Sequence, residues 1–122
     1  MLWEGIDKRN FPRVKHRCLI QISKADREER IDTFTENIGA GGICVIVSKP
    51  FEIFDTVSLE LHLDDGGSPI QCKGSVVWTV RDHTIKGEGS DNYDTGIEFI
   101  EISDEDRNRI SGLVEGLLSS EA

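Results

Sequence analysis

Residues 57–63 read Val57-Ser58-Leu59-Glu60-Leu61-His62-Leu63, an alternation of four apolar and three polar side chains. Successive side chains of a β-strand point to opposite faces of the sheet, so this stretch predicts a strand with one buried face and one wet face. The cluster Asp64-Asp65-Gly66-Gly67-Ser68-Pro69 follows and is typical of a turn. Residues 70–80 then alternate again, which predicts a long antiparallel pair. The apolar phase of this second strand consists of Ile70, Cys72, Gly74, Val76, Trp78 and Val80.

Two residues of the second strand carry expectations of their own. Gly74 is expected at a bulge or bend, because glycine inside a strand often marks the point where a small barrel curves. Trp78 falls on the apolar phase, so we expect it in the core rather than at a ligand.

Outward from this pair, the remaining chain also favours short strands. They are expected at residues 16–23, 30–36, 43–47 and 93–99, with a charged turn at 24–29 and an exposed loop at 81–92. The continuous apolar run at 43–47 indicates a strand buried on both faces. Ser103 offers a helix N-cap, and apolar residues at helical spacing predict one helix over about 104–118. No helical crossover separates the strands, so the pattern favours a mainly β fold, either an antiparallel barrel or a strongly bent sheet.

The length and the net charge of the chain limit the classes of function that are expected. The 122 residues form one domain, which is expected to act in trans. The net charge of −9 is uneven: residues 1–17 carry +3 and the rest carries −12. General binding of DNA or RNA is therefore not expected, although a basic arm can still capture a small anion.

Other classes of function have little support. The three cysteines are odd in number and widely spaced, and they are expected as reduced core residues with no metal site. No catalytic signature is present, and the acidic run at 104–106 is expected to cap the helix. No apolar run can span a bilayer and no signal core precedes the fold, so we expect a cytoplasmic, non-enzymatic protein without a cofactor or membrane insertion.

Two polar stretches remain, Arg9-Asn10-Phe11-Pro12-Arg13 and Asn37-Ile38-Gly39-Ala40-Gly41-Gly42. Two arginine forks can grip a phosphate or the O6/N7 edge of guanine, and a glycine-rich turn lets the backbone approach a ligand closely. Taken separately, each stretch also has a plain interpretation, as a solvated basic arm and as a tight turn between strands.

Taken together, Arg9-x-x-x-Arg13 and Asn37-x-Gly39-x-x-Gly42 resemble the PilZ family of bacterial cyclic di-GMP receptors over nearly the whole chain. The run at 93–99 resembles the family's late strand, in which a glycine precedes an apolar-x-aromatic run. The resemblance implies a six-stranded antiparallel barrel with a C-terminal helix at 16–122, preceded by a basic arm at 1–15. It also implies cyclic di-GMP as ligand. The ligand-binding residues that it implies are Lys8, Arg9, Arg13, Asn37, Gly39, Gly41, Gly42 and Gly96.

In this set the arginines would grip guanine edges and phosphates, Asn37 would read a base edge, and the neighbourhood of Lys8 would influence ligand stoichiometry. One position departs from the family pattern, because Gly39 stands where the family has serine. A ligand-contacting hydroxyl is therefore absent.

Three interpretations follow. The leading one is a receptor whose arm closes on the ligand and presents a changed surface to an effector protein. The second is a PilZ domain that has lost nucleotide binding and acts as a protein interaction adapter in motility, pilus or related machinery. The third, a barrel that binds single-stranded nucleic acid, conflicts with the net charge. A homodimer is compatible with each.

Overall fold

The computed structural model describes residues 13–24, 30–87 and 90–121. These residues form seven strands and one helix. The elements are β1 Arg13–Lys15, β2 Leu19–Lys24, β3 Arg30–Gly39, β4 Gly42–Val47, β5 Thr56–His62, β6 Ile70–Gly87, β7 Ser90–Glu101 and α2 Asp104–Glu121. Residues 1–12 and 25–29 lie outside this description, so the expected turn at 24–29 and most of the basic arm are not described.

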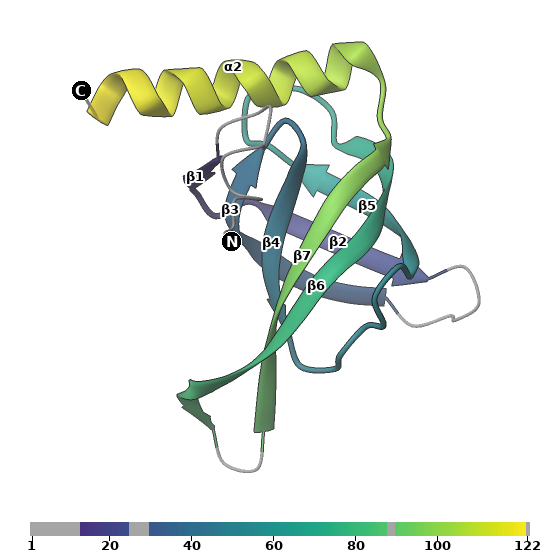
Figure 1. The fold of residues 1–122 in the computed structure, drawn as a ribbon. Helices are drawn as coiled ribbons and strands as arrows, with labels where there is room; N and C mark the ends of the chain where they lie inside the picture. Colours follow the sequence, from purple (N-terminus) through teal and green to yellow (C-terminus); the bar gives the residue numbers. More distant parts are fainter. Residues whose placement is uncertain (1–12, 25–29, 88–89, 122) are drawn as a thin grey trace, which may run out of the picture.

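The strands close into an antiparallel barrel (Figure 1). Around it the order is β2, β3, β4, β7, β6 and β5, and the β2–β5 pairing completes the ring. The short β1 lies beside β3, with Arg13 opposite Gly39 and Lys15 opposite Asn37. The prediction of a mainly β fold with a six-stranded barrel and a C-terminal helix is confirmed.

The barrel core is built by the predicted alternation. On β5 the side chains of Val57, Leu59 and Leu61 are buried, while the residues between them face outward. Strand β4 is buried at five of its six positions, as its continuous apolar run predicts. Each fully buried aliphatic side chain contributes about 1.5–3 kcal/mol relative to an exposed one, so these inward rows supply most of the stabilisation.

Helix α2 lies across one end of the barrel (Figure 1). Ser103 caps it, since its Oγ accepts a hydrogen bond from the backbone N–H of Asp106 at 3.1 Å. Ile110 and Val114 insert into the core. Arg109 ties the helix to the β5–β6 turn through two hydrogen bonds to Asp65, of 2.8 and 3.0 Å. Among the residues described, no helix is long and apolar enough to cross a membrane.

Strands β6 and β7 correct one expectation. The expected loop at 81–92 is instead largely a hairpin, with backbone pairing that extends to Gly87 and Ser90. This hairpin projects beyond the barrel (Figure 1). Its sequence lacks alternation because a projecting ribbon has no core face to bury, yet its backbone groups still pair across the two strands. The expectation for Gly74 is confirmed, since the β6–β7 register shifts between Lys73 and Gly74.

Candidate functional site

The candidate site begins with Arg13, which projects from β1 across the end of β3. Val14, the next residue, is buried in the core, so Arg13 faces the outside of the barrel. Its Nη1–H group donates a hydrogen bond to Oδ1 of Asn37 at 3.5 Å. Its Nη2 lies 3.1 Å from the point where a Cβ on Gly42 would stand. The structure therefore brings together three predicted site residues. Asn37 and Gly42 lie 24 and 29 positions after Arg13 in the sequence.

Asn37 reaches this outer face through a β-bulge. Thr35 pairs with Val45 and Asn37 pairs with Cys44, so Glu36 is an extra residue in β3. Without it, Asn37 would point to the same side as the fully buried Thr35. The bulge turns the Asn37 amide outward, beside Arg13.

The Asn37-to-Gly42 segment is a hairpin turn whose ends pair at Gly39 and Gly42. Gly42 is required for space: a Cβ there would collide with the backbone carbonyl oxygen of Ile97 and lie 3.2 Å from Cα of Glu98. Among the described glycines, Gly66 has a positive φ, whereas the glycines of this turn do not. Glycine is therefore needed at position 42 because β4, β7 and Arg13 approach one another closely there, and not because the backbone is left-handed.

Gly39 and Gly41 have different surroundings. Gly39 is buried between its two partners, Arg13 on β1 and Gly42 on β4. The carbonyl of Gly41 accepts a hydrogen bond from the N–H of Phe99 at 3.0 Å, which joins the turn to β7. The turn is thus held in place by both neighbouring strands.

Trp78 lies on the same outer face and corrects the expectation that it is a core residue. The β6–β7 register shifts between Val76 and Trp78, so Val77 is an extra residue in β6. Val76 is fully buried, whereas Trp78 is 37% exposed and Val80 is 55% exposed. The bulge moves the following side chains of β6 to the opposite face. The sequence-based prediction instead extends the alternation through Trp78 and Val80.

A single row of paired residues crosses this face. From β1 to β6 it runs through Lys15, Asn37, Cys44, Gly96 and Trp78. A Cβ on Gly96 would collide with the indole of Trp78, so the ring occupies the space above that glycine. Gly96, predicted as a site residue, therefore lies in one row with Asn37. Lys8 and Arg9, also predicted, lie outside the described residues.

The row is polar at one end and apolar at the other. Cys44 faces outward by its phase in β4 but is only 6% exposed. Burial, reinforced by Asp94, raises the pKa of this thiol to about 11, against an opposing effect of Arg13. The thiol is therefore neutral at physiological pH and serves as an apolar surface. Asp94 and Glu98 flank Gly96 on β7 and place carboxylates beside the row.

The sequence pattern missed Trp78 and Cys44 as residues of this face, because both were expected in the core. For Trp78 a signal exists: Val76 and Val77 are adjacent apolar residues inside an alternating strand. Such a pair is compatible with a bulge at this point.

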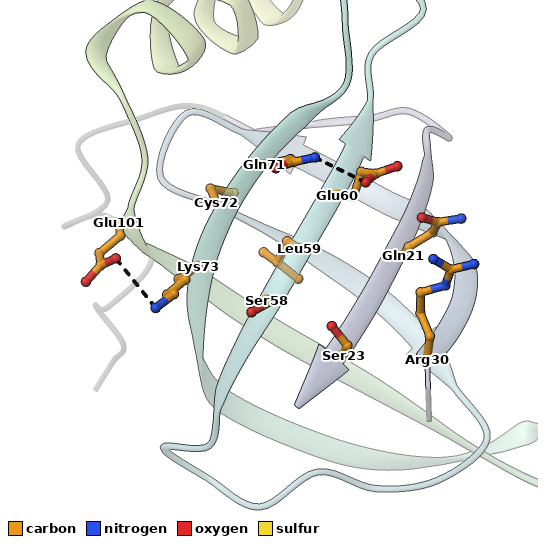
Figure 2. A pocket seen from close by; sticks show the side chains of 10 residues that line it. All are labelled: Gln21, Ser23, Arg30, Ser58, Leu59, Glu60, Gln71, Cys72, Lys73 and Glu101. Carbon is orange, nitrogen blue, oxygen red and sulfur yellow. Dashed lines mark hydrogen bonds and ion pairs between the residues drawn. The ribbon is translucent and has the colours of Figure 1, made fainter. Parts of the chain in front are cut away.

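A hollow lies elsewhere on the barrel surface, over β2, β5 and β6 (Figure 2). It has a volume of about 480 Å³, and the short side chains of Ser23 and Ser58, which are paired across β2 and β5, lie within it. Its charged residues balance, with Arg30 and Lys73 against Glu60 and Glu101. Of the predicted site residues that the structure describes, none lines it, and a neutral hollow gives no net attraction for an anion.

The barrel, the terminal helix and the arginine beside a glycine turn define a class of small β-barrel domain that carries an arginine and a glycine turn on its outer face. The chain matches the PilZ domain family over residues 7–116, and it belongs to that family. No curated protein matches it.

Solved structures agree on the fold. The Bacillus subtilis inhibitor of motility MotI/DgrA is 22% identical, with a TM-score of 0.80 over 94% of this chain and 53% of that chain. The PilZ domain of YcgR from Escherichia coli, solved with c-di-GMP, is 12% identical, with a TM-score of 0.72 over 93% and 94%. The MrkH–c-di-GMP complex of K. pneumonia is 17% identical, with a TM-score of 0.70 over 93% and 54%. The chain thus spans about half the length of MotI and MrkH.

Proposed function

We propose that this chain is a cyclic di-GMP receptor that signals to a partner protein. The observation that carries the proposal is the convergence of Arg13, Asn37 and Gly42 on one outer face of the barrel. Membership of the PilZ family and the c-di-GMP present in two structures of similar fold support this choice of ligand.

The chemistry of the cluster suits a guanine dinucleotide. The Arg13 guanidinium is planar and permanently charged, and it can donate two parallel hydrogen bonds to a phosphate or to the O6/N7 edge of guanine. Its bond to Asn37 is long, at 3.5 Å, and a charge-assisted hydrogen bond to a ligand oxygen at about 2.8 Å would be stronger. The Asn37 amide then becomes available to read a base edge, and Gly42 leaves room for the guanidinium.

The N-terminal arm would complete the site. Its described end, Arg13–Lys15, is already paired with β3, which fixes the point from which the preceding residues reach the ligand. In the proposal Lys8 and Arg9 contact the bound dianion and order the arm over the barrel. A ligand changes such an equilibrium only through its different affinity for the two states, so these contacts provide the signal. Amide hydrogen exchange within residues 5–12 should slow when cyclic di-GMP is added, and unchanged exchange would contradict this mechanism.

Gly39 is expected to weaken binding. A hydrogen bond to a charged group contributes about 1.5–3 kcal/mol, so the absent serine hydroxyl corresponds to a loss of somewhat more than tenfold up to about a hundredfold in affinity. Gly39→Ser is expected to recover part of it. This departure also favours the second candidate function, an adapter that binds no nucleotide and recognises a partner through the barrel surface.

The deciding experiment is isothermal titration with cyclic di-GMP. The parent is expected to bind, and Arg13→Ala is expected to weaken binding at least about tenfold, because a charge-assisted fork is lost. Arg30→Ala is the matched control: this arginine lines the groove over β2, β5 and β6, with its side chain 59% exposed. Equal effects of the two variants on affinity would contradict a specific site. If the parent releases or absorbs no heat of binding, the second candidate function, an adapter that binds no nucleotide, is favoured.

A further inference from the structure

We propose that the exposed end of the apolar stripe on α2 binds residues 2–6 of the same chain, with the Trp3 indole packed against Leu118. This contact requires no nucleotide, so the inference goes beyond the proposed function. It is carried by the point at which the stripe leaves the barrel, by the point at which the chain enters β1, and by the chemistry of the two segments.

The apolar stripe of α2 continues past the part of the barrel that covers it. Ile110, Val114 and Leu118 recur at intervals of four residues, so they lie along one side of the helix. Ile110 is fully buried and Val114 is 2% exposed, whereas Leu118 is 42% exposed. The C-terminal part of α2 extends past β1 and the barrel wall (Figure 1). Leu118 therefore presents an apolar surface to solvent, because the helix is longer than the barrel end on which it lies.

The chain enters the fold on this side of the barrel. In the described part of the molecule α2 packs against β3 and β1, and β1 begins at Arg13. Ile6 precedes Arg13 by seven residues, which gives a reach of up to about 23 Å when the chain is extended. Helix α2 has 18 residues and is about 27 Å long. Residues 2–6 can therefore reach Leu118 with no change in the described fold.

The segment supplies the apolar side chains that could cover Leu118. Leu2, Trp3 and Ile6 are three large apolar residues within five positions. Contact with Leu118 removes apolar area of both partners from water, which is favourable in proportion to the area. Tryptophan suits the edge of such a contact, because its ring packs while the indole N–H can keep a hydrogen bond to water.

The charges favour the chain's own arm as the occupant. Residues 1–17 carry a net charge of +3, whereas the last turn of α2 has no basic residue and Glu115, one turn earlier, is exposed. The C-terminal end of a helix also carries a partial negative charge. The field therefore attracts the basic arm to this end of α2, whereas a second copy of the chain, with its net charge of −9, is repelled.

Docking restricts the arm at both of its ends. Arg13 is held on β1 and residues 2–6 are held on α2, so Lys8 and Arg9 lie in a short bridge between two fixed points. Such a bridge loses less conformational freedom when a ligand orders it. This consequence rests on the proposed function, but the docking itself does not, and its test contains no nucleotide.

The test follows the emission of Trp3. The chain contains two tryptophans, so Trp78→Phe leaves Trp3 as the sole tryptophan reporter. In this variant Trp3 should emit at a shorter wavelength than in the urea-unfolded chain, and acrylamide should quench it less, because the docked ring is shielded from water. Addition of Leu118→Ser should move both measurements toward their values in urea.

The matched control is Ile53→Ser in the same background. Ile53 is also 42% exposed, but it lies in the loop between β4 and β5. That loop lies away from α2 (Figure 1). This variant should change neither the wavelength of Trp3 emission nor its quenching. Circular dichroism verifies the fold of each variant, and if Leu118→Ser does not fold, the emission and quenching of Trp78→Phe alone decide.

A double-mutant cycle gives an independent measurement. In the parent, Trp3→Ser and Leu118→Ser are each expected to lower the urea midpoint of unfolding. The double variant should lower it by less than the sum of the two shifts, because residues in contact share one interaction. Additive shifts would contradict a direct contact.

The remaining outcomes separate this inference from its alternatives. Trp3 emission and quenching equal to those in urea overturn the docking, and so do equal effects of Leu118→Ser and Ile53→Ser. Emission that depends on protein concentration assigns the surface to a second copy and overturns the proposal. A shift confined to Leu118→Ser, with non-additive midpoints, supports it. Failure of the docking leaves the receptor intact, because calorimetry with cyclic di-GMP tests that function separately.

Discussion

Gly42→Ala adds a single methyl group at the point where three elements of the site meet. A Cβ there would lie closer than 3.0 Å to the carbonyl oxygen of Ile97, a separation that real Cβ atoms essentially never show. It would also lie 3.2 Å from Cα of Glu98. Both atoms belong to backbone that is paired with β4, so neither can rotate away as a flexible side chain would.

The expected size of the effect follows from this geometry. Strands β4 and β7 must separate locally, and overpacking of this kind costs about 1–3 kcal/mol. For a domain of this length, 1 kcal/mol corresponds to roughly 3–6 °C in Tm. Gly42→Ala is therefore expected to lower Tm by roughly 3 to 18 °C. The same methyl group would displace Arg13, whose Nη2 lies 3.1 Å from the Cβ position, so binding of cyclic di-GMP should weaken as well.

The assay is equilibrium unfolding in urea, with Gly112→Ala as the matched control. Gly112 lies in α2, is exposed, and has nothing within 4 Å of the Cβ position. The same chemical change there should stabilise the protein by about 0.5–1 kcal/mol, because alanine favours the helix. The two variants should move the urea midpoint in opposite directions with an unchanged slope. A midpoint for Gly42→Ala at or above that of the parent would refute the packing argument.

Two further changes test the framework around the site. Thr35→Val should destabilise the protein by about 1–3 kcal/mol in urea unfolding, because the fully buried Thr35 hydroxyl accepts from the N–H of Cys18 at 2.9 Å and donates to the carbonyl of His16 at 2.7 Å; a cost below about 0.5 kcal/mol would contradict this. Asp65→Asn should lower Tm most above about pH 4, because hydrogen bonds from Arg109 lower the pKa of Asp65 to about 2, so the stabilisation is present when the carboxyl is ionised and disappears as pH falls toward 2. A difference in Tm that does not vary between pH 2 and 6 would exclude this ion pair as its source.

Much of the fold was predictable because its signals are local. Alternation at 57–63 and 70–76 identified the central strands, and Ser103 with the spaced apolar residues identified the helix. These patterns are reliable because a half-buried strand or helix must repeat its apolar residues with its own period. The hairpin at 81–92 escaped prediction for the same reason, since it extends past the core and its backbone pairing leaves no apolar pattern.

The site was predictable only in part. The sequence by itself identified Arg13, Asn37 and Gly42 as candidates, since they stand out as an arginine, an amide and a glycine in two short polar stretches. The tertiary structure decided that they meet, through the pairing of β1 with β3 and of β3 with β4. It also decided that Trp78 faces outward.

The physical reason lies in the two bulges. One extra residue at Glu36 and one at Val77 reverse the side-chain phase of β3 and β6, and so turn Asn37 and Trp78 to the outer face. A bulge is defined by two residues that oppose one on the neighbouring strand. Its position therefore depends on the partner strand, and only the folded barrel fixes it.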